Sequence, residues 1–292
     1  MDEIEALTGR LALAGYIAEP SLATSLLLMQ ELERPLLVEG DAGVGKTAIA
    51  LALARAGGAE LIRLQCYEGL DVAAAVYEWN YQRQLLAIRL QEGSDRSLAE
   101  RERHVFGEEY LLRRPLLEAI SRPQAPVLLI DEVDRADEEF EAYLLELLSD
   151  YQISIPELGT IRATSIPRVL LTSNGTRELS DALRRRCLYF YLDYPDAAKE
   201  LRIVRTRVPQ IEAQLAGQVV AFVQALRGLD LQKRPGTAET LDWAAALLRL
   251  GVASLPQAGA GLADTLGCLL KTREDLAALP PSELARLVEQ SG

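Results

Sequence analysis

The stretch RPLLVEGDAGVGKT, residues 34–47, joins a short apolar run to a glycine-rich loop that ends in a lysine and a threonine. It matches G-x-x-x-x-G-K-[ST] at each fixed position, with Gly40, Gly45, Lys46 and Thr47. In this motif the glycines let backbone N–H groups wrap around phosphates, the lysine reaches the β- and γ-phosphates, and the hydroxyl binds Mg²⁺. A helix-forming segment, TAIALALARA, follows, and a helix N-terminus favours anions. The alternative is an ordinary glycine turn before a lysine, but this context favours a nucleotide-binding loop.

Five apolar runs predict the strands of an α/β domain. The first, third and fourth are continuously apolar, which suits central strands of a parallel sheet that is buried on both faces. Helical patterns lie between the runs. In the clearest, DEEFEAYLLELLSDY, the side chains that share one face are Phe140, Tyr143, Leu144, Leu147 and Leu148. Strands that alternate with helices imply a doubly wound sheet with ligands at the carboxyl ends of its strands. The expected strands are 35–39, 60–65, 126–131, 168–173 and 188–194.

The chain changes character after about Tyr194. From there the apolar periodicity is helical and strand signals stop. We therefore expect an α/β nucleotide-binding domain over 1–194 and a small all-helical domain over 195–292, with Pro195 at the joint. The charged stretch 91–109 is expected to be a solvated insert, either helical or mobile.

Carboxylates follow the third expected strand, and an amide follows the fourth. Asp131 ends VLLID, where it can hold the water shell of Mg²⁺, and Glu132 can polarise a water molecule for attack on the γ-phosphate. Asn174 would emerge beside Glu132 and orient that water. The alternatives are a charged turn after the strand and a turn-forming Asn-Gly pair. Together with the loop, the pattern favours hydrolysis over phosphoryl transfer to a metabolite.

Three consecutive arginines, 184–186, end a predicted short helix before the fifth strand. They could simply complement the helix dipole. The functional alternative is an arginine finger, which stabilises charge in the transition state and here would point into the nucleotide of a neighbouring subunit.

The composition disfavours several classes of function and site. The formal net charge of -12 disfavours binding to a phosphate backbone. The three cysteines lie far apart and His104 is the only histidine, so a disulfide framework, a zinc site and a His-based triad are not expected. The acidic N-terminus lacks an apolar signal core and no apolar run approaches ~20 residues, so we expect a soluble, cytoplasmic protein without a membrane span.

The order of these motifs resembles that of the AAA+ ATPases. The segments GYIAEPSLATSLLLMQELERPLLVEGDAGVGKT, LIDEVDRADEEFEAYLLELLSDYQISIPELG and LDYP are similar to the MoxR branch. The segment QCYEGLDVAAAVYEWNYQRQLL looks most like the corresponding part of the CoxD-type members, which are associated with maturation of molybdenum–copper carbon monoxide dehydrogenase. The resemblance implies an AAA+ P-loop domain with a central parallel five-stranded sheet, followed by a helical lid.

The resemblance also implies roles for individual residues. Lys46 and Thr47 belong to Walker A, Asp131 and Glu132 to Walker B, and Asn174 is sensor 1. Arg186 aligns best with the arginine finger, and Arg185 is its rival. ATP and Mg²⁺ are the implied cofactors, with Thr47 and Asp131 at the metal. The implied nucleotide contacts are Asp41, Ala42, Gly43, Val44, Gly45, Lys46, Thr47 and Ala48, with Tyr16 and Ile17 at the adenine.

Of two further segments, one matches the family's pattern and the other departs from it. ISIPELGTIRA, residues 153–163, matches the family's extra hairpin before sensor 1, although an ordinary surface hairpin is the alternative. The lid departs from the family, because Arg234 precedes a proline where the family's sensor 2 arginine follows one in an SPR-like helix start.

The resemblance implies a homo-hexameric ring, a partner with a von Willebrand A-type domain, and a protein client such as a metalloenzyme. Our first hypothesis is a chaperone-like remodelling ATPase. The alternatives are a nucleic-acid motor, which the acidic charge disfavours, and a nucleotide-dependent scaffold with little turnover. A metabolite kinase is the least favoured, since no acceptor pocket is evident.

Overall fold

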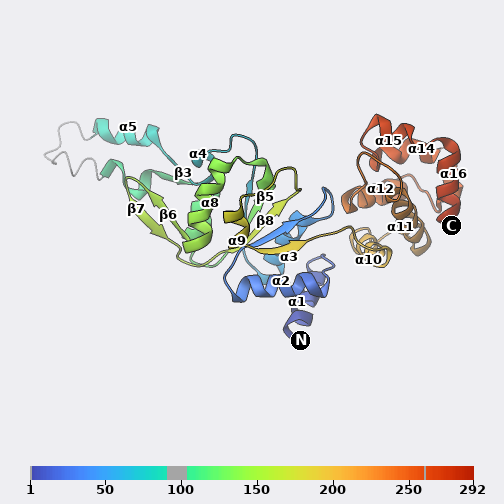
Figure 1. Ribbon diagram of the computed structural model, residues 1–292, viewed down its shortest axis with the longest axis horizontal. Helices are drawn as coiled ribbons and strands as arrows, with labels where there is room; N and C mark the ends of the chain where they lie inside the picture. The colour runs from blue at the N-terminus through green and yellow to red at the C-terminus, as the bar shows by residue number, and fades with distance from the viewer. Residues whose placement is uncertain (1, 91–103, 260) are drawn as a thin grey trace. The chain divides into compact units, whose positions relative to one another are not determined.

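The computed structural model describes residues 2–90, 104–259 and 261–292 (Figure 1). Most of the expected insert 91–109 thus lies outside the described residues. The chain forms two compact units, which are described separately. The first unit contains residues 1–7, 20–39 and 53–190, and the second contains 8–19, 40–52 and 191–292. The domain boundary at residue 194 stays a prediction.

A five-stranded sheet, ordered β2-β5-β8-β1-β9, forms the centre of the first unit. Its β5 pairs in parallel with β2 and β8, and β8 pairs in parallel with β1. Every residue of β5 is buried, as the continuously apolar run predicted. The predicted central parallel sheet is confirmed. The strands are β1 (Leu36–Glu39), β2 (Leu61–Gln65), β5 (Val127–Asp131), β8 (Arg168–Ser173) and β9 (Leu188–Tyr191).

The last strand is shorter than predicted. β9 ends at Tyr191, three residues before the expected end at Tyr194. Its neighbour β1 has only four residues, so the sheet offers no pairing partner for a longer strand.

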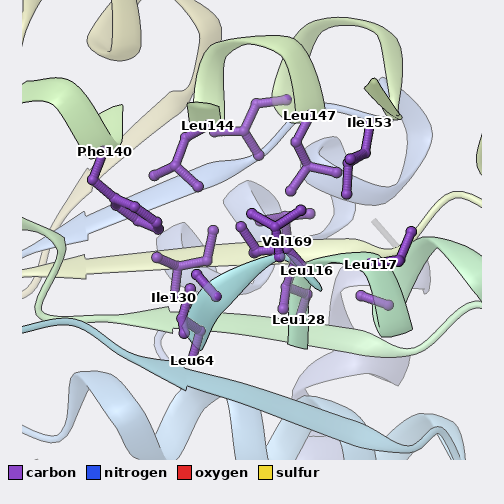
Figure 2. Close-up of a cluster of buried hydrophobic side chains, with 14 of the residues drawn as sticks. Leu64, Leu116, Leu117, Leu128, Ile130, Phe140, Leu144, Leu147, Ile153 and Val169 are labelled. Carbon is purple, nitrogen blue, oxygen red and sulfur yellow. The ribbon is translucent and has the colours of Figure 1, made fainter. Parts of the chain in front are cut away.

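The core of the first unit lies between the sheet and α8 (Glu138–Asp150). Figure 2 shows Phe140, Leu144 and Leu147 of this helix above Leu128 and Ile130 of β5. Asp137 caps the helix by accepting a hydrogen bond from the N–H of Phe140 at 2.9 Å. Tyr143, which the helical spacing put on the apolar face, is 54% exposed instead.

Other elements surround this sheet. The described helices of the first unit include α2 (Pro20–Glu31), α4 (Val72–Ala75), α5 (Tyr81–Leu90), α7 (Pro115–Ser121) and α9 (Asp181–Arg186), with short 3-10 turns at Glu108–Tyr110 and Val133–Arg135. Antiparallel pairs are formed by β3 (Tyr77–Trp79) with β4 (Leu111–Arg113), and by β6 (Gln152–Ile155) with β7 (Gly159–Arg162). The second pair is the hairpin expected over 153–163. Two helices continue from one unit into the other along the chain, α1 (Asp2–Leu13) and α3 (Lys46–Gly57).

The C-terminal part of the second unit is helical. Its core surrounds Trp243 and Phe222, whose ring centroids lie 4.9 Å apart. The helices are α10 (Ala197–Arg207), α11 (Ala213–Arg227), α12 (Thr237–Arg249), α13 (Leu255–Ala258), α14 (Gly261–Thr265), α15 (Arg273–Ala277) and α16 (Pro281–Gln290), with a 3-10 turn at Leu266–Cys268. No described helix has the length and apolar character that crossing a membrane requires.

Candidate functional site

The glycine-rich loop directly follows β1 in the sequence and has a backbone that requires glycine. Gly43 and Gly45 have φ values of +81° and +101°, in the left-handed region that side chains disfavour. A Cβ atom on Gly40 would lie 2.2 Å from the carbonyl oxygen of Leu192. The loop therefore depends on its glycines both for its turns and for close packing.

Lys46 begins α3 and lies against the loop that precedes it. Its side chain is buried, and its ammonium group donates hydrogen bonds to the carbonyls of Gly40 at 2.6 Å and Asp41 at 2.8 Å. These contacts hold the cation at the N-terminus of α3, where the helix dipole also favours negative charge. The exposed Thr47 follows it on the first turn of the same helix.

A cavity of about 210 Å³ adjoins the loop within the second unit. This is many times the volume of one water molecule. The loop and the start of α3 contribute Gly43, Val44, Gly45 and Ala48 to its lining, and Tyr16 and Ile17 line it as well. Burial raises the pKa of the Tyr16 hydroxyl, so this side chain stays neutral. The structure thus brings Tyr16 and Ile17 to the same cavity as the loop, while their contact with adenine stays a prediction.

The N-terminus of α12 packs directly on the loop. A Cβ atom on Gly236 would lie 2.7 Å from the Cα atom of Gly43, so both positions need glycine for this approach. Glu239 accepts a hydrogen bond from the N–H of Gly236 at 3.0 Å, which fixes the start of the helix. A displacement of this end of α12 would therefore also displace the glycine-rich loop.

Arg234 lies just before this helix, on a separate hollow. That hollow is lined by Asp41 and Ala42 of the loop, together with the cationic side chains of Lys233, Arg234 and Lys271. Arg234 is exposed. It precedes Pro235 and α12, and this is the position where the sequence departs from the family's sensor 2 pattern.

In the first unit, Asp131 is held at the end of β5 by side chains from the two neighbouring strands. It is 2% exposed. The guanidinium of Arg63 on β2 donates to one carboxylate oxygen at 3.0 and 2.6 Å, and the hydroxyl of Thr172 on β8 donates to the other at 2.6 Å. The carboxylate is therefore fixed in orientation and partly charge-balanced.

Glu132 follows with a left-handed backbone, φ 55° and ψ 51°. Non-glycine residues seldom adopt this conformation, and a surrounding structure must hold it. Here its N–H donates to the hydroxyl of Thr172 at 2.8 Å. Its carboxylate accepts hydrogen bonds from Gln65 at 3.0 Å and Arg135 at 3.1 Å. The turn directs the carboxylate away from the strand and into a polar setting.

Asn174 follows β8 and lies next to Glu132, with its amide nitrogen 3.5 Å from the carboxylate. Its backbone N–H donates to the buried carboxylate of Asp134 at 3.2 Å, and Thr176 donates to the same oxygen from its N–H at 3.0 Å and its hydroxyl at 2.6 Å. Burial acts to raise the pKa of Asp134, but the hydrogen bonds from Thr176 and Asn174 outweigh it and lower that pKa. Asp134 thus anchors the loop that carries Asn174.

The three arginines at the end of α9 differ in their surroundings. Arg186 donates to the hydroxyl of Ser149 at 2.5 Å and to the carbonyl of Ala182 at 2.9 Å, so its side chain is engaged within its own chain. Arg185 has a side chain that is 79% exposed and pairs with Asp181 one turn earlier at 2.7 Å. Arg184 lies 3.4 Å from the carboxylate of Glu39.

The sequence did not reveal the residues that hold the site in place. Arg63, Gln65 and Thr172 position the two carboxylates, and Asp134 positions the loop that carries Asn174. Signals for some of them existed. Thr172 interrupts the apolar run of its strand two residues before Asn174, and Asp134 follows the two catalytic candidates in IDEVD. Their partners come from strands far apart in the sequence, so their contacts could not be predicted from spacing.

The donors expected at a magnesium ion fit that metal chemically. Mg²⁺ prefers hard oxygen ligands and takes few of them from protein, with water and phosphate supplying the rest. Thr47 offers a hydroxyl and Asp131 a carboxylate. Among the described residues, no group of three or more His, Cys, Asp or Glu side chains could hold a metal ion. A site that relies on phosphate oxygens is the kind that this donor set suits.

Residues 35–187, a segment that includes β1 and α9, match the AAA domain of the dynein-related subfamily. The chain belongs to this family. The match includes the glycine-rich loop, the acidic turn after β5 and Asn174. The AAA+ part of the predicted resemblance is therefore confirmed.

Two curated relatives of this AAA-domain protein cover most of the chain. The gas vesicle ATPase GvpN of Haloferax mediterranei is 24% identical over 214 residues, which is 68% of the chain but 57% of GvpN. The chain thus spans little more than half of that relative. The denitrification regulatory protein NirQ of Stutzerimonas stutzeri is 26% identical over 243 residues, 80% of the chain and 78% of NirQ.

A solved structure, that of a candidate ATPase from Cytophaga hutchinsonii ATCC 33406, has a similar fold. The TM-score is 0.50 at 15% sequence identity, and the match covers 95% of the chain and 84% of that protein. At this identity the likeness concerns the fold alone.

Proposed function

We propose that this AAA-domain protein is an ATPase of the MoxR type, which uses ATP hydrolysis to change the conformation of a protein client. The AAA domain and the ATPase name of the relative GvpN support ATPase activity. The observation that carries the proposal is the turn after β5, where Glu132 is held with its carboxylate 3.5 Å from the amide of Asn174. A general base for water needs a carboxylate within reach of that water, and the neighbouring amide can orient the water molecule.

Each residue of the proposed site has its own role in binding or hydrolysing ATP. The N–H groups of the loop and the ammonium of Lys46 bind the phosphates, and the cavity beside Tyr16 and Ile17 takes the adenine. Glu132 accepts the proton of the attacking water, which Asn174 orients. Mg²⁺, held by Thr47 and through water by Asp131, would neutralise charge on the phosphates. The water oxygen forms a bond to the γ-phosphorus while the bond between this phosphorus and the β–γ bridging oxygen breaks, so ADP leaves with the bridging oxygen and inorganic phosphate is the second product.

An arginine from a neighbouring copy completes the proposed site. Such an arginine must be free to leave its own chain, and Arg185 meets this need better than Arg186, whose guanidinium bonds Ser149 and Ala182. We therefore place Arg185 first, although the resemblance to the family favours Arg186. A finger supplied in trans requires an assembly of copies, for which we propose a homo-hexameric ring.

The client and the partner follow from the resemblance alone. We propose a cytoplasmic ATPase that works with a protein carrying a von Willebrand A-type domain. Its proposed client is a metalloenzyme, such as carbon monoxide dehydrogenase or a related molybdenum hydroxylase. The relatives carry names from two other settings, gas vesicles and denitrification.

ATP turnover measured at rising protein concentration, beside light scattering, tests the activity. We expect turnover per copy to rise with assembly. Glu132→Gln should lower turnover by about 10²-fold or more while ATP binding persists, and the matched variant Glu138→Gln, at an exposed position on α8, should behave as wild type. Tight ATP binding without turnover in the assembled wild type would instead indicate a nucleotide-dependent scaffold.

A further inference from the structure

Thr237, the first residue of α12, has a buried hydroxyl that makes no hydrogen bond to the described residues. The residue is 7% exposed and lines the cavity that adjoins the glycine-rich loop. Buried polar groups in folded proteins are almost always paired, so an unpaired one calls for a specific reason.

The other buried threonines in the described part of the chain differ from Thr237, because their hydroxyls form hydrogen bonds. The hydroxyls of Thr172, Thr240 and Thr265 each donate a hydrogen bond, to Asp131 at 2.6 Å, to Glu200 at 2.8 Å and to the carbonyl of Leu262 at 2.7 Å. Thr240 lies one turn after Thr237 on the same helix. The fold therefore satisfies buried hydroxyls around it, and Thr237 is the exception at the cavity.

The lining of the cavity indicates what would pair with this hydroxyl. Leu192, Ile203 and Leu241 contribute apolar surface, while the phosphate-binding loop forms one edge. The charged Lys199 is already paired with Glu19 at 2.6 Å. Ligand sites combine apolar walls, which suit a flat ring, with a few polar groups that fix its orientation.

We propose that Thr237 is a nucleotide-contacting residue, whose hydroxyl forms a hydrogen bond with the base or ribose of an adenine nucleotide in this cavity. The inference rests on the proposed function. It gives the first turn of α12 a direct polar link to the nucleotide, next to the contact between Gly236 and Gly43. The lid would then sense the nucleotide through a threonine at the helix start, without needing an arginine there.

Two variants of the full-length protein test this contact. Thr237→Val keeps the shape and removes the hydroxyl, and Thr237→Ser keeps the hydroxyl. Calorimetric titration with Mg·ADP should show binding to Thr237→Val that is roughly threefold to tenfold weaker than wild type. Thr237→Ser should stay within about twofold. Without nucleotide, the melting temperature of Thr237→Val should not fall, because the lost hydroxyl has no hydrogen-bond partner among the described residues.

Equal ADP affinity in wild type and Thr237→Val would overturn the inference. So would a lower melting temperature of Thr237→Val without nucleotide, since the hydroxyl would then have a structural role. If wild type itself binds no ADP, the proposed function fails first. A titration with 2′,3′-dideoxyADP locates the contact: a loss confined to wild type indicates the ribose, and an equal loss in both proteins indicates the base.

Discussion

The hydroxyl of Thr172 accepts a hydrogen bond from the N–H of Glu132 at 2.8 Å, and the same hydroxyl donates to Asp131 at 2.6 Å. One side chain on β8 thus sets the left-handed turn that carries Glu132 and the orientation of Asp131. Positioning groups of this kind are often as important to a reaction as the groups that they hold.

Thr172→Val should therefore lower kcat for ATP by about tenfold or more. The KM should change less, because the glycine-rich loop that binds the phosphates is left intact. Steady-state kinetics on the assembled protein measures both constants. Thr172→Ser keeps the hydroxyl and should recover most of kcat; equal losses in both variants would mean that packing, not hydrogen bonding, matters at this position.

Acid should destabilise the first unit partly through Asp134. Burial opposes the charge, but hydrogen bonds from Thr176 and Asn174 lower the pKa of this carboxyl below its unfolded value of 3.8. The stabilisation is present above that unfolded value and is lost as pH falls through the folded one. We expect the difference in unfolding free energy between wild type and Asp134→Asn to shrink between pH 6 and pH 3. The exposed control Asp150→Asn should track wild type, and a constant difference for Asp134→Asn would contradict this prediction.

The second unit should depend on one buried ion pair. Glu200 is fully buried and accepts two hydrogen bonds from Arg227 at 2.7 and 2.6 Å, while Gln224 and Thr240 bond the same carboxylate. Glu200→Gln leaves a buried guanidinium without its counter-charge, which should cost about 3–5 kcal/mol of unfolding free energy. Denaturant melts measure this, with the exposed Glu212→Gln as control. A loss under about 1 kcal/mol would show that the pair is not a main support of the unit.

Alanine variants of the two candidate finger arginines should differ in stability. Arg185→Ala removes an exposed side chain and should abolish assembly-dependent turnover with little change in melting temperature. Arg186→Ala breaks bonds to Ser149 and Ala182 and should lower the unfolding free energy by about 1–2 kcal/mol. Turnover lost in Arg186→Ala at unchanged stability would assign the finger to Arg186 instead.

Much of the fold could be predicted because its signals are local. The glycine-rich loop, the continuously apolar run that became β5 and the Asp-capped α8 each depend on neighbouring residues. The end of β9 could not be predicted, because the length of β1, its neighbour across the sheet, limits it. Tyr143 shows a similar limit, since helical spacing alone does not tell which edge of an apolar face stays exposed.

Some residues of the site could likewise be predicted from local sequence, and others could not. Residue types and motif spacing pointed to Lys46, Asp131, Glu132 and Asn174 as candidates. The supports of these residues come from other strands, as with Arg63 on β2 and Thr172 on β8, and pairing across a sheet is not written in local spacing. The unpaired hydroxyl of Thr237 became visible only once the hydrogen bonds of its surroundings were known.

In the proposed assembly one copy supplies Glu132 and its neighbour supplies the arginine, and mixing two inactive variants tests this arrangement. Glu132→Gln and Arg185→Ala should each hydrolyse ATP poorly alone. Mixed in equal amounts under assembly conditions, roughly a quarter of neighbouring pairs would carry both intact groups if copies mix at random. We predict that the mixture regains turnover well above the sum of the two variants. A mixture that shows scrambled subunits by light scattering and mass analysis, yet no gain in turnover, would contradict a site shared between copies in this way.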